Sequence, residues 1–393
     1  MSDQPVRILA SHQASAIIRR EVSRRRLLTF SAAAASAAAL AACAPVDPQA
    51  GGAPAATGGP LADNLNIYTW GDYDDPSVLE TFTAQLGPQI TLDSYGSNEE
   101  MIAKLIAARG TSGYDIVVPT GVFIPQMIEN GLLEQLNLDL LPNLRYMDEA
   151  YLAQDWDPQN QYSICKAWGT TGFVYDTTVI SRDLQTWDDF LDAAQNEASG
   201  RTTVLDDPKE LVGVYFWANG IDWNTTDPAD LDAAEAYLTQ TLAPHVSAFD
   251  SYPGGSAIPT GSQVLMHAWN GDARLGILNS PEPDRWAWRL GGPTTQLWMD
   301  NWAIAQGAQN VEAAHAFINY TMTPENQLVQ LDYIGYHTGA AGIEAAAAAE
   351  ELPMLDLVFF SPEQLATMKN GALNEAQDRI VAIWNAMKAA AGA

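Results

Sequence analysis

The stretch Leu65-Asn-Ile-Tyr-Thr-Trp70-Gly-Asp72-Tyr73-Asp-Asp75-Pro76 decides the fold, because its character changes halfway along. Leu65 to Thr69 alternates apolar and polar residues, with β-branched and aromatic members, which is typical of a short strand. Gly71 breaks this pattern. Asp75 and Pro76 then supply an N-cap and a first-turn proline for a helix that begins near Ser77. The stretch therefore predicts a strand, a loop and a helix in succession.

Trp70, Asp72 and Tyr73 fall in the predicted loop and could together bind an organic cation. Loops that follow strands lie at the carboxyl ends of those strands, where open α/β sheets bind their ligands. Aromatic rings offer negative π faces, and a carboxylate offers a counter-charge. The alternative is that Trp70 and Tyr73 only cover the end of the sheet, because aromatic side chains are commonly packing residues.

Alternating strands and helices continue after this loop and predict a doubly wound α/β fold. Gln89 to Ser94 is typical of a second strand, and Asp115 to Thr120 of a buried third strand. Asn98 is expected to be the N-cap of the helix between them. Such a series forms parallel βαβ units, and the pattern restarts at Trp168 to Tyr175.

Polar residues follow two further strand ends. Thr120 could line the ligand crevice, although a hydroxyl at that place is also ordinary turn chemistry. Asp207, Pro208 and Glu210 stand at a helix start in a capping-box arrangement, which places two carboxylates over that start. Capping alone could account for both acids, since acids at helix N-termini are favoured electrostatically.

Tryptophan and an acid recur together at other strand ends. Trp269 precedes Asp272, and Trp298 stands beside Asp300 and Trp302 on one strand face by the period of two. A packed core does not need a carboxylate beside each tryptophan, because an unpaired buried charge is costly. The recurrence therefore favours a cation-binding site over simple packing.

The charge balance excludes several classes of partner. The chain has 393 residues, with 48 acidic and 19 basic ones, and a formal net charge of −29. A body so acidic is a poor partner for nucleic acid or anionic lipid, whereas its field attracts polycations. The same charge also suits plain solubility or a salty habitat, so it does not identify a ligand.

The first 43 residues are expected to be an export signal. An arginine-rich segment precedes an uncharged run from Leu27 to Ala42, and Ser23-Arg24-Arg25 resembles a twin-arginine signal. Leu40-Ala-Ala-Cys43 resembles the lipobox of bacterial lipoproteins, so Cys43 is expected to be acylated; an uncleaved anchor helix is the alternative. Residues 44–63 are expected to be a flexible tether.

Cys165 is then the remaining thiol and is expected to be a buried small hydrophobe, without a disulfide or a cysteine metal site.

From about Leu65 to Lys388 the chain resembles the substrate-binding proteins of bacterial polyamine (spermidine/putrescine) ABC transporters. The resemblance lies in motifs that follow the strand ends already described: Tyr68-Thr-Trp70-Gly-Asp-Tyr73, Ser97-Asn98-Glu99-Glu100-Met101, Tyr114-Asp-Ile-Val-Val-Pro119, Trp269-Asn270-Gly271 and Trp298-Met299-Asp300. It implies a two-lobe periplasmic-binding-protein-like (type II) α/β fold whose lobes close around the ligand. We expect lobe 1 to be residues 64–168 plus 298–339, and lobe 2 to be residues 169–297 plus 340–393.

The resemblance also implies roles for individual residues. The residues expected to box the methylene chain of a polyamine are Trp70, Tyr73, Trp269 and Trp298; those expected to meet its ammonium groups are Asp72, Asp207, Glu210 and Asp300, with Thr120 as a hydroxyl partner. Two positions depart from the family pattern. Val122 replaces a second aromatic, and Asn374 stands where a glutamine is common, so the amine could be a diamine, a triamine or another cation.

The expected function is therefore capture of a polyamine outside the cytoplasm and delivery to an ABC transporter permease. We expect a monomer that touches the membrane only through its lipid anchor and needs neither cofactor nor metal. A binding protein of the same fold for another solute is the first alternative. An enzyme is the second, since Asp207 and Asp300 could act as the acid pair of a glycoside hydrolase, but the common hydrolase and phosphate-binding motifs are absent from the sequence.

Overall fold

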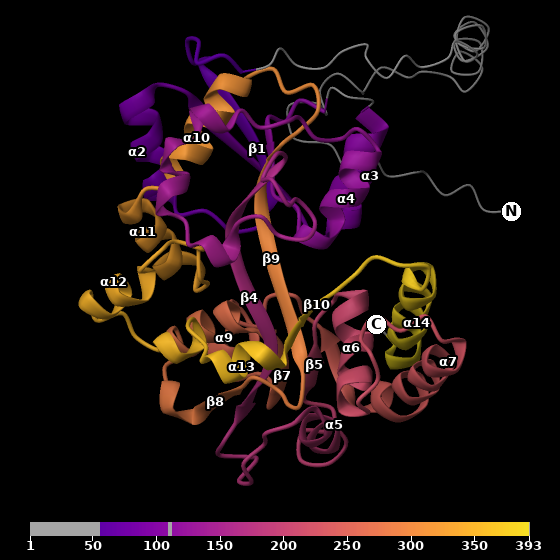
Figure 1. Ribbon diagram of the computed structural model, residues 1–393. Helices are drawn as coiled ribbons and strands as arrows, with labels where there is room; N and C mark the ends of the chain where they lie inside the picture. The colour runs from indigo at the N-terminus through magenta and orange to yellow at the C-terminus, as the bar shows by residue number, and fades with distance from the viewer. Residues whose placement is uncertain (1–55, 109–111, 393) are drawn as a thin grey trace, which may run out of the picture. The chain divides into compact units, whose positions relative to one another are not determined.

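The opening stretch folds as its pattern predicts, into strand β1 (Asn64–Trp70) and helix α2 (Pro76–Leu86). Asp75 is the N-cap of α2, and its side chain accepts from the backbone nitrogens of Ser77 at 2.7 Å and Val78 at 3.4 Å. The structure is a computed structural model that describes residues 56–108 and 112–392. Figure 1 shows β1 and α2 at one end of the long strand β9 (Thr295–Ile304).

The elements around β1 form parallel βαβ units, as expected. These elements are β2 (Gln89–Tyr95), α3 (Asn98–Ala108), β3 (Ile116–Val117) and α4 (Ile124–Glu129). β1 pairs in parallel with both β2 and β3. Helices α10 (Val311–Thr321) and α11 (Pro324–Ile334) return from much later in the sequence to pack here, where Phe317 meets Phe82 of α2 at a ring distance of 5.1 Å. β3 is shorter than predicted, and Thr120 beyond it forms an isolated bridge with Asp300.

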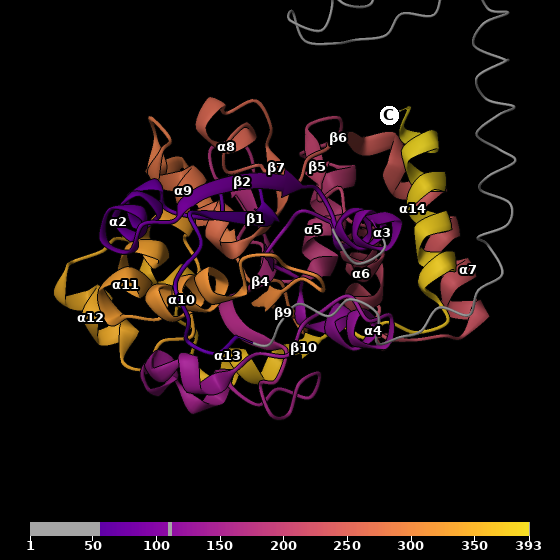
Figure 2. The same cartoon turned by 90° about the horizontal axis from the view of Figure 1, so that it is seen from above.

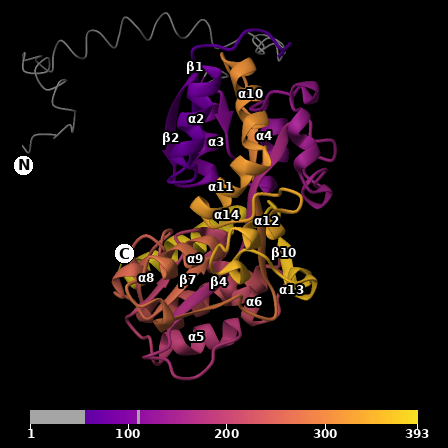
Figure 3. The same cartoon turned by 90° about the vertical axis from the view of Figure 1, so that its left-hand side faces the viewer.

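Two long antiparallel strands, β4 (Ser163–Asp176) and β9, change partners along their length. Residues 163–170 of β4 pair with β9, and residues 171–175 pair with β7 (Leu265–Trp269). β9 pairs with β3 at its C-terminal end and with β10 (Met368–Asn370) at its N-terminal end. All residues of β4 are buried, and its register shifts between Cys165 and Ala167. β4 and β9 thus join the elements around β1 to those around β7 (Figure 1). Figure 3 shows these two groups one above the other.

The elements around β7 form a second α/β group. They are α5 (Trp187–Gln195), β5 (Thr202–Val204), α6 (Pro208–Ala218), α7 (Pro228–Tyr237), β6 (Val246–Phe249), α8 (Ala257–Thr260), α9 (Asn270–Leu278), β8 (Trp286–Arg289), α13 (Pro362–Thr367) and α14 (Gln377–Ala391). Helix α12 (Ile343–Ala349) packs instead against α11. Strand pairing runs β2-β1-β3-β9-β4-β7-β5-β6. Figure 2 shows α14 alongside α6 and α7. Phe173, Trp187 and Trp217 lie in the core of this group.

Residues 56–59 contact the body, although they belong to the segment expected to be a tether. Ala56 is buried, and its carbonyl accepts from the Asn137 amide at 2.9 Å. The backbone nitrogens of Thr57 and Gly58 donate to the Glu312 carboxylate at 2.7 and 3.1 Å. The expectation of a tether through residue 63 is therefore wrong for these residues. Residues 1–55, with the expected signal and Cys43, lie outside the described residues.

Cys165 is a free thiol in the interior, 1% exposed, as predicted. Burial raises the pKa of this thiol far above its usual value, so it stays protonated. In the part of the chain that the structure describes, no helix has both the length and the apolar character needed to cross a membrane.

Candidate functional site

Asp300 lies at the centre of one end of the candidate site and is 6% exposed. The Thr120 hydroxyl donates to Asp300 Oδ1 at 2.7 Å, so Thr120 is a hydroxyl partner of this acid. Asn98 fixes Thr120 in turn: its amide nitrogen donates to the hydroxyl at 3.0 Å, and its oxygen accepts from the Thr120 backbone nitrogen at 3.0 Å. The structure thus builds a chain of hydrogen bonds from α3 to β9.

The prediction that Asn98 is the N-cap of a helix is wrong. The Ser97 hydroxyl accepts from the Glu100 backbone nitrogen at 3.2 Å and occupies that role. Asn98 is buried and turns its amide toward Thr120. Sequence reasoning missed it as a site residue because Ser97 and Asn98 are both good capping residues, and only the distant Thr120 decides between them.

Burial raises the pKa of Asp300 to about 6, while the hydrogen bond from Thr120 and the charge of Lys166 oppose the rise. Tyr73 lies close by: burial and then the charge of Asp300 raise the pKa of its phenol. The Tyr73 hydroxyl is buried and meets no described atom at hydrogen-bond geometry. Tyr73 and Asp300, predicted separately, are thus brought together.

Lys166 is a residue that sequence reasoning missed. It lies at the register shift of β4, and its Nζ donates to the Tyr73 carbonyl at 2.7 Å and to Asp74 Oδ1 at 2.8 Å. Nζ also lies 4.3 Å from the ring centre of Tyr73 and 4.4 Å from that of Trp302. Both charged side chains are at most 2% exposed. A lone lysine within an apolar strand is the signal that could have found it.

Glu210 forms the other end of the candidate site and is 3% exposed. Its Oε1 accepts from the Thr171 hydroxyl and from the Trp269 indole nitrogen, both at 2.8 Å. The Gln296 amide, with its nitrogen turned toward Glu210, donates to Oε2 at 3.1 Å. Burial, followed by the charge of Asp207, raises the pKa of Glu210 to about 8.

The expected capping box over α6 is therefore wrong for Glu210. Asp207 caps the helix by accepting from the backbone nitrogens of Lys209 at 2.8 Å and Glu210 at 2.9 Å. The Glu210 side chain turns away from the cap toward β4 and β7, where Thr171 and Trp269 offer donors. Capping accounts for Asp207 alone, and Glu210 needs another explanation.

The predicted aromatic residues do not share one environment. Trp70 donates from its indole nitrogen to the Val118 carbonyl at 3.2 Å and lies 4.7 Å from the Tyr95 ring, so it also packs the end of the sheet. Trp298 meets Tyr336 edge-on at 4.9 Å, and its buried indole nitrogen has no partner among the described residues. Trp269 is half-buried beside Glu210.

Asp72 and Asn374 contact neither Asp300 nor Glu210. Asp72 is exposed with a left-handed φ of 52° and makes no hydrogen bond with a described residue. The Asn374 amide nitrogen donates to the Asn224 carbonyl at 2.8 Å, and its oxygen accepts from the Ala376 backbone nitrogen at 3.0 Å. Asn374 therefore fixes the turn before α14. Val122 is half-buried in the short helical turn Gly121–Phe123.

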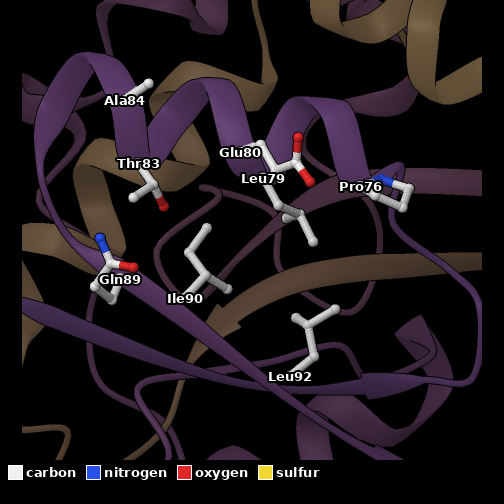
Figure 4. Close-up of a pocket in the computed structure, with 8 residues that line it drawn as sticks. All are labelled: Pro76, Leu79, Glu80, Thr83, Ala84, Gln89, Ile90 and Leu92. Carbon is white, nitrogen blue, oxygen red and sulfur yellow. The ribbon is translucent and has the colours of Figure 1, made fainter.

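A surface pocket of about 490 Å³ lies elsewhere, between α2 and β2 (Figure 4). It is lined by Pro76, Leu79, Glu80, Thr83, Ala84, Gln89, Ile90 and Leu92, none of which is a candidate site residue. Among the described residues, no cluster of His, Cys, Asp or Glu side chains could hold a metal ion.

Residues 77–355 match the family of bacterial extracellular solute-binding proteins, and the chain belongs to this family. Among its relatives, a spermidine/putrescine-binding periplasmic protein of Haemophilus influenzae is 31% identical over 287 residues, which cover 73% of this chain and 77% of the relative. A putative spermidine/putrescine ABC transporter structure from Listeria monocytogenes has a TM-score of 0.72 at 28% identity, and covers 83% of this chain and 98% of that chain. A lipoprotein structure from Treponema pallidum also has a TM-score of 0.72 at 28% identity, over 83% of this chain and 99% of that chain.

These similarities confirm the predicted fold class, a two-lobe binding-protein fold of mixed α/β type. They also confirm that the chain belongs among transport-associated solute-binding proteins rather than enzymes. The alternative of a glycoside hydrolase with Asp207 and Asp300 as its acid pair is therefore rejected. The geometry agrees, because Asp207 is engaged in capping α6.

Proposed function

We propose that this protein captures a polyamine such as putrescine or spermidine and delivers it to the permease of an ABC transporter. The observation that carries the proposal is the state of Asp300 and Glu210, which are buried carboxylates held by neutral donors. In the described part of the chain neither has a lysine or arginine at ion-pair distance; His267 lies 3.8 Å from Glu210, but burial lowers the pKa of this imidazole to about 3. Buried carboxylates without a cation are costly, so a cationic ligand is their natural partner.

β9 supplies the line along which such a ligand would lie. Gln296, Trp298 and Asp300 share one face of the strand by the period of two, and Gln296 contacts Glu210. The strand positions of Gln296 and Asp300 are roughly 13 Å apart along the axis, with an indole between them. An extended polyamine matches this arrangement, because its two terminal ammonium groups would meet Asp300 and Glu210 and its methylenes would lie against the indole of Trp298. The further residues proposed for the site are Trp70, Asp72, Tyr73, Trp269 and Asp207, the last of which would contribute its charge while it caps α6.

Calorimetry with a matched neutral ligand tests the proposal. Putrescine and spermidine are expected to release or absorb heat on binding, whereas 1,4-butanediol, which has the same carbon chain without the charges, is expected to give none. Equal binding of the diol, or no binding of any amine at millimolar concentration, contradicts polyamine capture. A thermal-shift panel of other organic cations and small solutes then finds the alternative ligand, because a ligand at 100 times its dissociation constant adds roughly 2.7 kcal/mol of stability.

Amine affinity is expected to fall as the pH decreases. The pKa of Glu210 is about 8 and that of Asp300 about 6 in the free protein, and a protonated carboxyl offers no counter-charge. A bound ammonium lowers both pKa values, so binding releases protons and weakens below about pH 8 and more steeply below about pH 6, by up to about tenfold per pH unit and group. Calorimetry with putrescine between about pH 5 and 8 measures this, since both of its amines stay protonated in that range. A flat profile contradicts the assignment of both carboxylates.

We propose that residues 64–168 plus 298–339 form lobe 1 and residues 169–297 plus 340–393 form lobe 2. The partner changes of β4 near residue 170 and of β9 near residue 298 support these boundaries. The lobes would close around the ligand by rotation about the crossing strands. Small-angle scattering is expected to give the mass of a monomer and a smaller radius of gyration with putrescine than without. An unchanged radius at saturating amine contradicts closure.

We also propose that the mature protein is tethered to the outer face of the membrane through acylated Cys43. The Leu40-Ala-Ala-Cys43 sequence supports this, and the Treponema relative is described as a lipoprotein. Cys43→Ser is expected to move the protein to the soluble fraction or to leave an unprocessed precursor. Fractionation and the mass of the mature chain measure the outcome. A variant that is processed and still bound to the membrane contradicts the lipid anchor.

A further inference from the structure

Lys166 occupies a place that is built like an ammonium-binding site. Its Nζ lies over the rings of Tyr73 and Trp302, at 4.3 and 4.4 Å from their centres, and pairs with Asp74 at 2.8 Å. Two aromatic rings and one carboxylate are the chemistry expected of a site for the ligand's own ammonium. The structure fills this place with a side chain of the protein, so one face of Tyr73 is not open to a ligand.

The position of this lysine relative to Asp300 matters for the charge that the site can hold. Tyr73 is near both groups, since its ring lies 4.3 Å from Nζ, and burial followed by the charge of Asp300 raises the pKa of its phenol. The strand pairing places Lys166 beside Asp300, because the next residue of β4, Ala167, pairs with Asp300 of β9, and the Lys166 ammonium lowers the pKa of Asp300. The Lys166 ammonium is therefore close to the Asp300 end of the site. A like charge brought near this end is opposed by the fixed ammonium.

We propose that Lys166 is a specificity-determining residue. Because its ammonium occupies the place beside Tyr73 and Trp302, the Asp300 end of the site accepts only one ammonium group of the ligand. This inference rests on the proposed capture of polyamines. Putrescine carries an ammonium at each end only, whereas spermidine has an additional internal ammonium that must come closer to one of the acids. The fixed charge of Lys166 disfavours that additional ammonium near Asp300, and the site prefers the diamine.

The test compares the ratio of spermidine to putrescine affinity in matched variants. The double substitution K166M/D74N removes the paired charges together, so the net charge and the diffuse attraction of the body are unchanged. Its ratio is expected to shift toward spermidine by on the order of tenfold, because the repelling ammonium is gone. K166R keeps a cation at the same place and is expected to keep the wild-type ratio. Single K166M, where it folds, is expected to shift the ratio at least as far as the double variant.

The outcomes separate this inference from the proposed function. If wild type binds amines and the double variant weakens both equally, Lys166 only positions the Tyr73 loop and the specificity role is overturned. A ratio that shifts equally in K166R overturns the role of charge and assigns the effect to shape. If wild type binds neither amine, the proposed function fails and the inference fails with it. Unfolding curves of each variant, measured alongside, establish that the ratio is read on folded protein.

Discussion

Asp300→Asn is expected to weaken the binding of putrescine and spermidine by about 2–5 kcal/mol, because a ligand ammonium then enters a buried place without its counter-charge. Asp300 is 6% exposed, and its described hydrogen-bond donor is the neutral Thr120 hydroxyl. The asparagine oxygen can accept the same hydrogen bond, so the fold is expected to survive. Because burial raises the pKa of Asp300, removing its charge should leave the stability unchanged or increased. Calorimetry and urea unfolding measure the two effects separately.

Trp269→Ala serves as the comparison for this variant. The indole contributes a cation–π interaction and apolar area along the ligand, together about 1–3 kcal/mol. It also donates to Glu210 at 2.8 Å, so the variant leaves that carboxylate with one donor fewer. The loss is expected to be smaller than for Asp300→Asn and to persist at high salt, because only the diffuse attraction of the acidic body is screened. Unchanged affinity in both variants removes these residues from the site.

Lys166→Met is expected to lower the free energy of unfolding by about 3–5 kcal/mol, because the substitution leaves the Asp74 carboxylate buried without its counter-charge, with only the Thr69 hydroxyl as a donor. The two charged side chains are at most 2% exposed and 2.8 Å apart. The Lys166 ammonium also holds the Tyr73 carbonyl at 2.7 Å, so the loop after β1 loses its link to β4. Urea unfolding monitored by tryptophan fluorescence measures the loss.

The charge-balanced double variant K166M/D74N is the control for this loss. It removes both members of the pair and is expected to recover a large part of the stability, since an uncompensated charge costs more than an absent pair. The deficit of single K166M is also expected to shrink as the pH falls, because the unpaired Asp74, whose pKa burial already raises, can then take up a proton. A single variant that is as stable as wild type at pH 7, or a double variant no better than the single one, contradicts this account of the pair.

The sequence alone predicted the elements whose signals are local. The alternation from Leu65 and the Asp75-Pro76 pair identified β1 and the start of α2, because strand periodicity and helix capping depend on neighbours in the chain. The recurrence of tryptophan beside acids identified Asp300 as a candidate, and the helix start at Asp207 and Pro208 identified Glu210. The family resemblance then gave the fold class, which the similarity to known structures confirmed.

The tertiary structure decided what each candidate side chain does. Glu210 and Asp207 stand at the same helix start, yet Asp207 caps it and Glu210 turns to Thr171 and Trp269. Local patterning cannot distinguish them, because a buried polar group takes its partner from whichever distant segment the fold brings near.

The role of Lys166, a positively charged side chain, also depends on long-range contacts. Its partners Asp74 and Trp302 come from separate parts of the chain, and their meeting depends on the pairing of β4 with β9. The sequence therefore determined which residues could bind a cation. Only the packed structure decided that, among the described residues, Asp300 and Glu210 have no cationic partner in the protein and that Asp74 is paired with a lysine. The reason is that burial and long-range contacts set the free-energy cost of each charge.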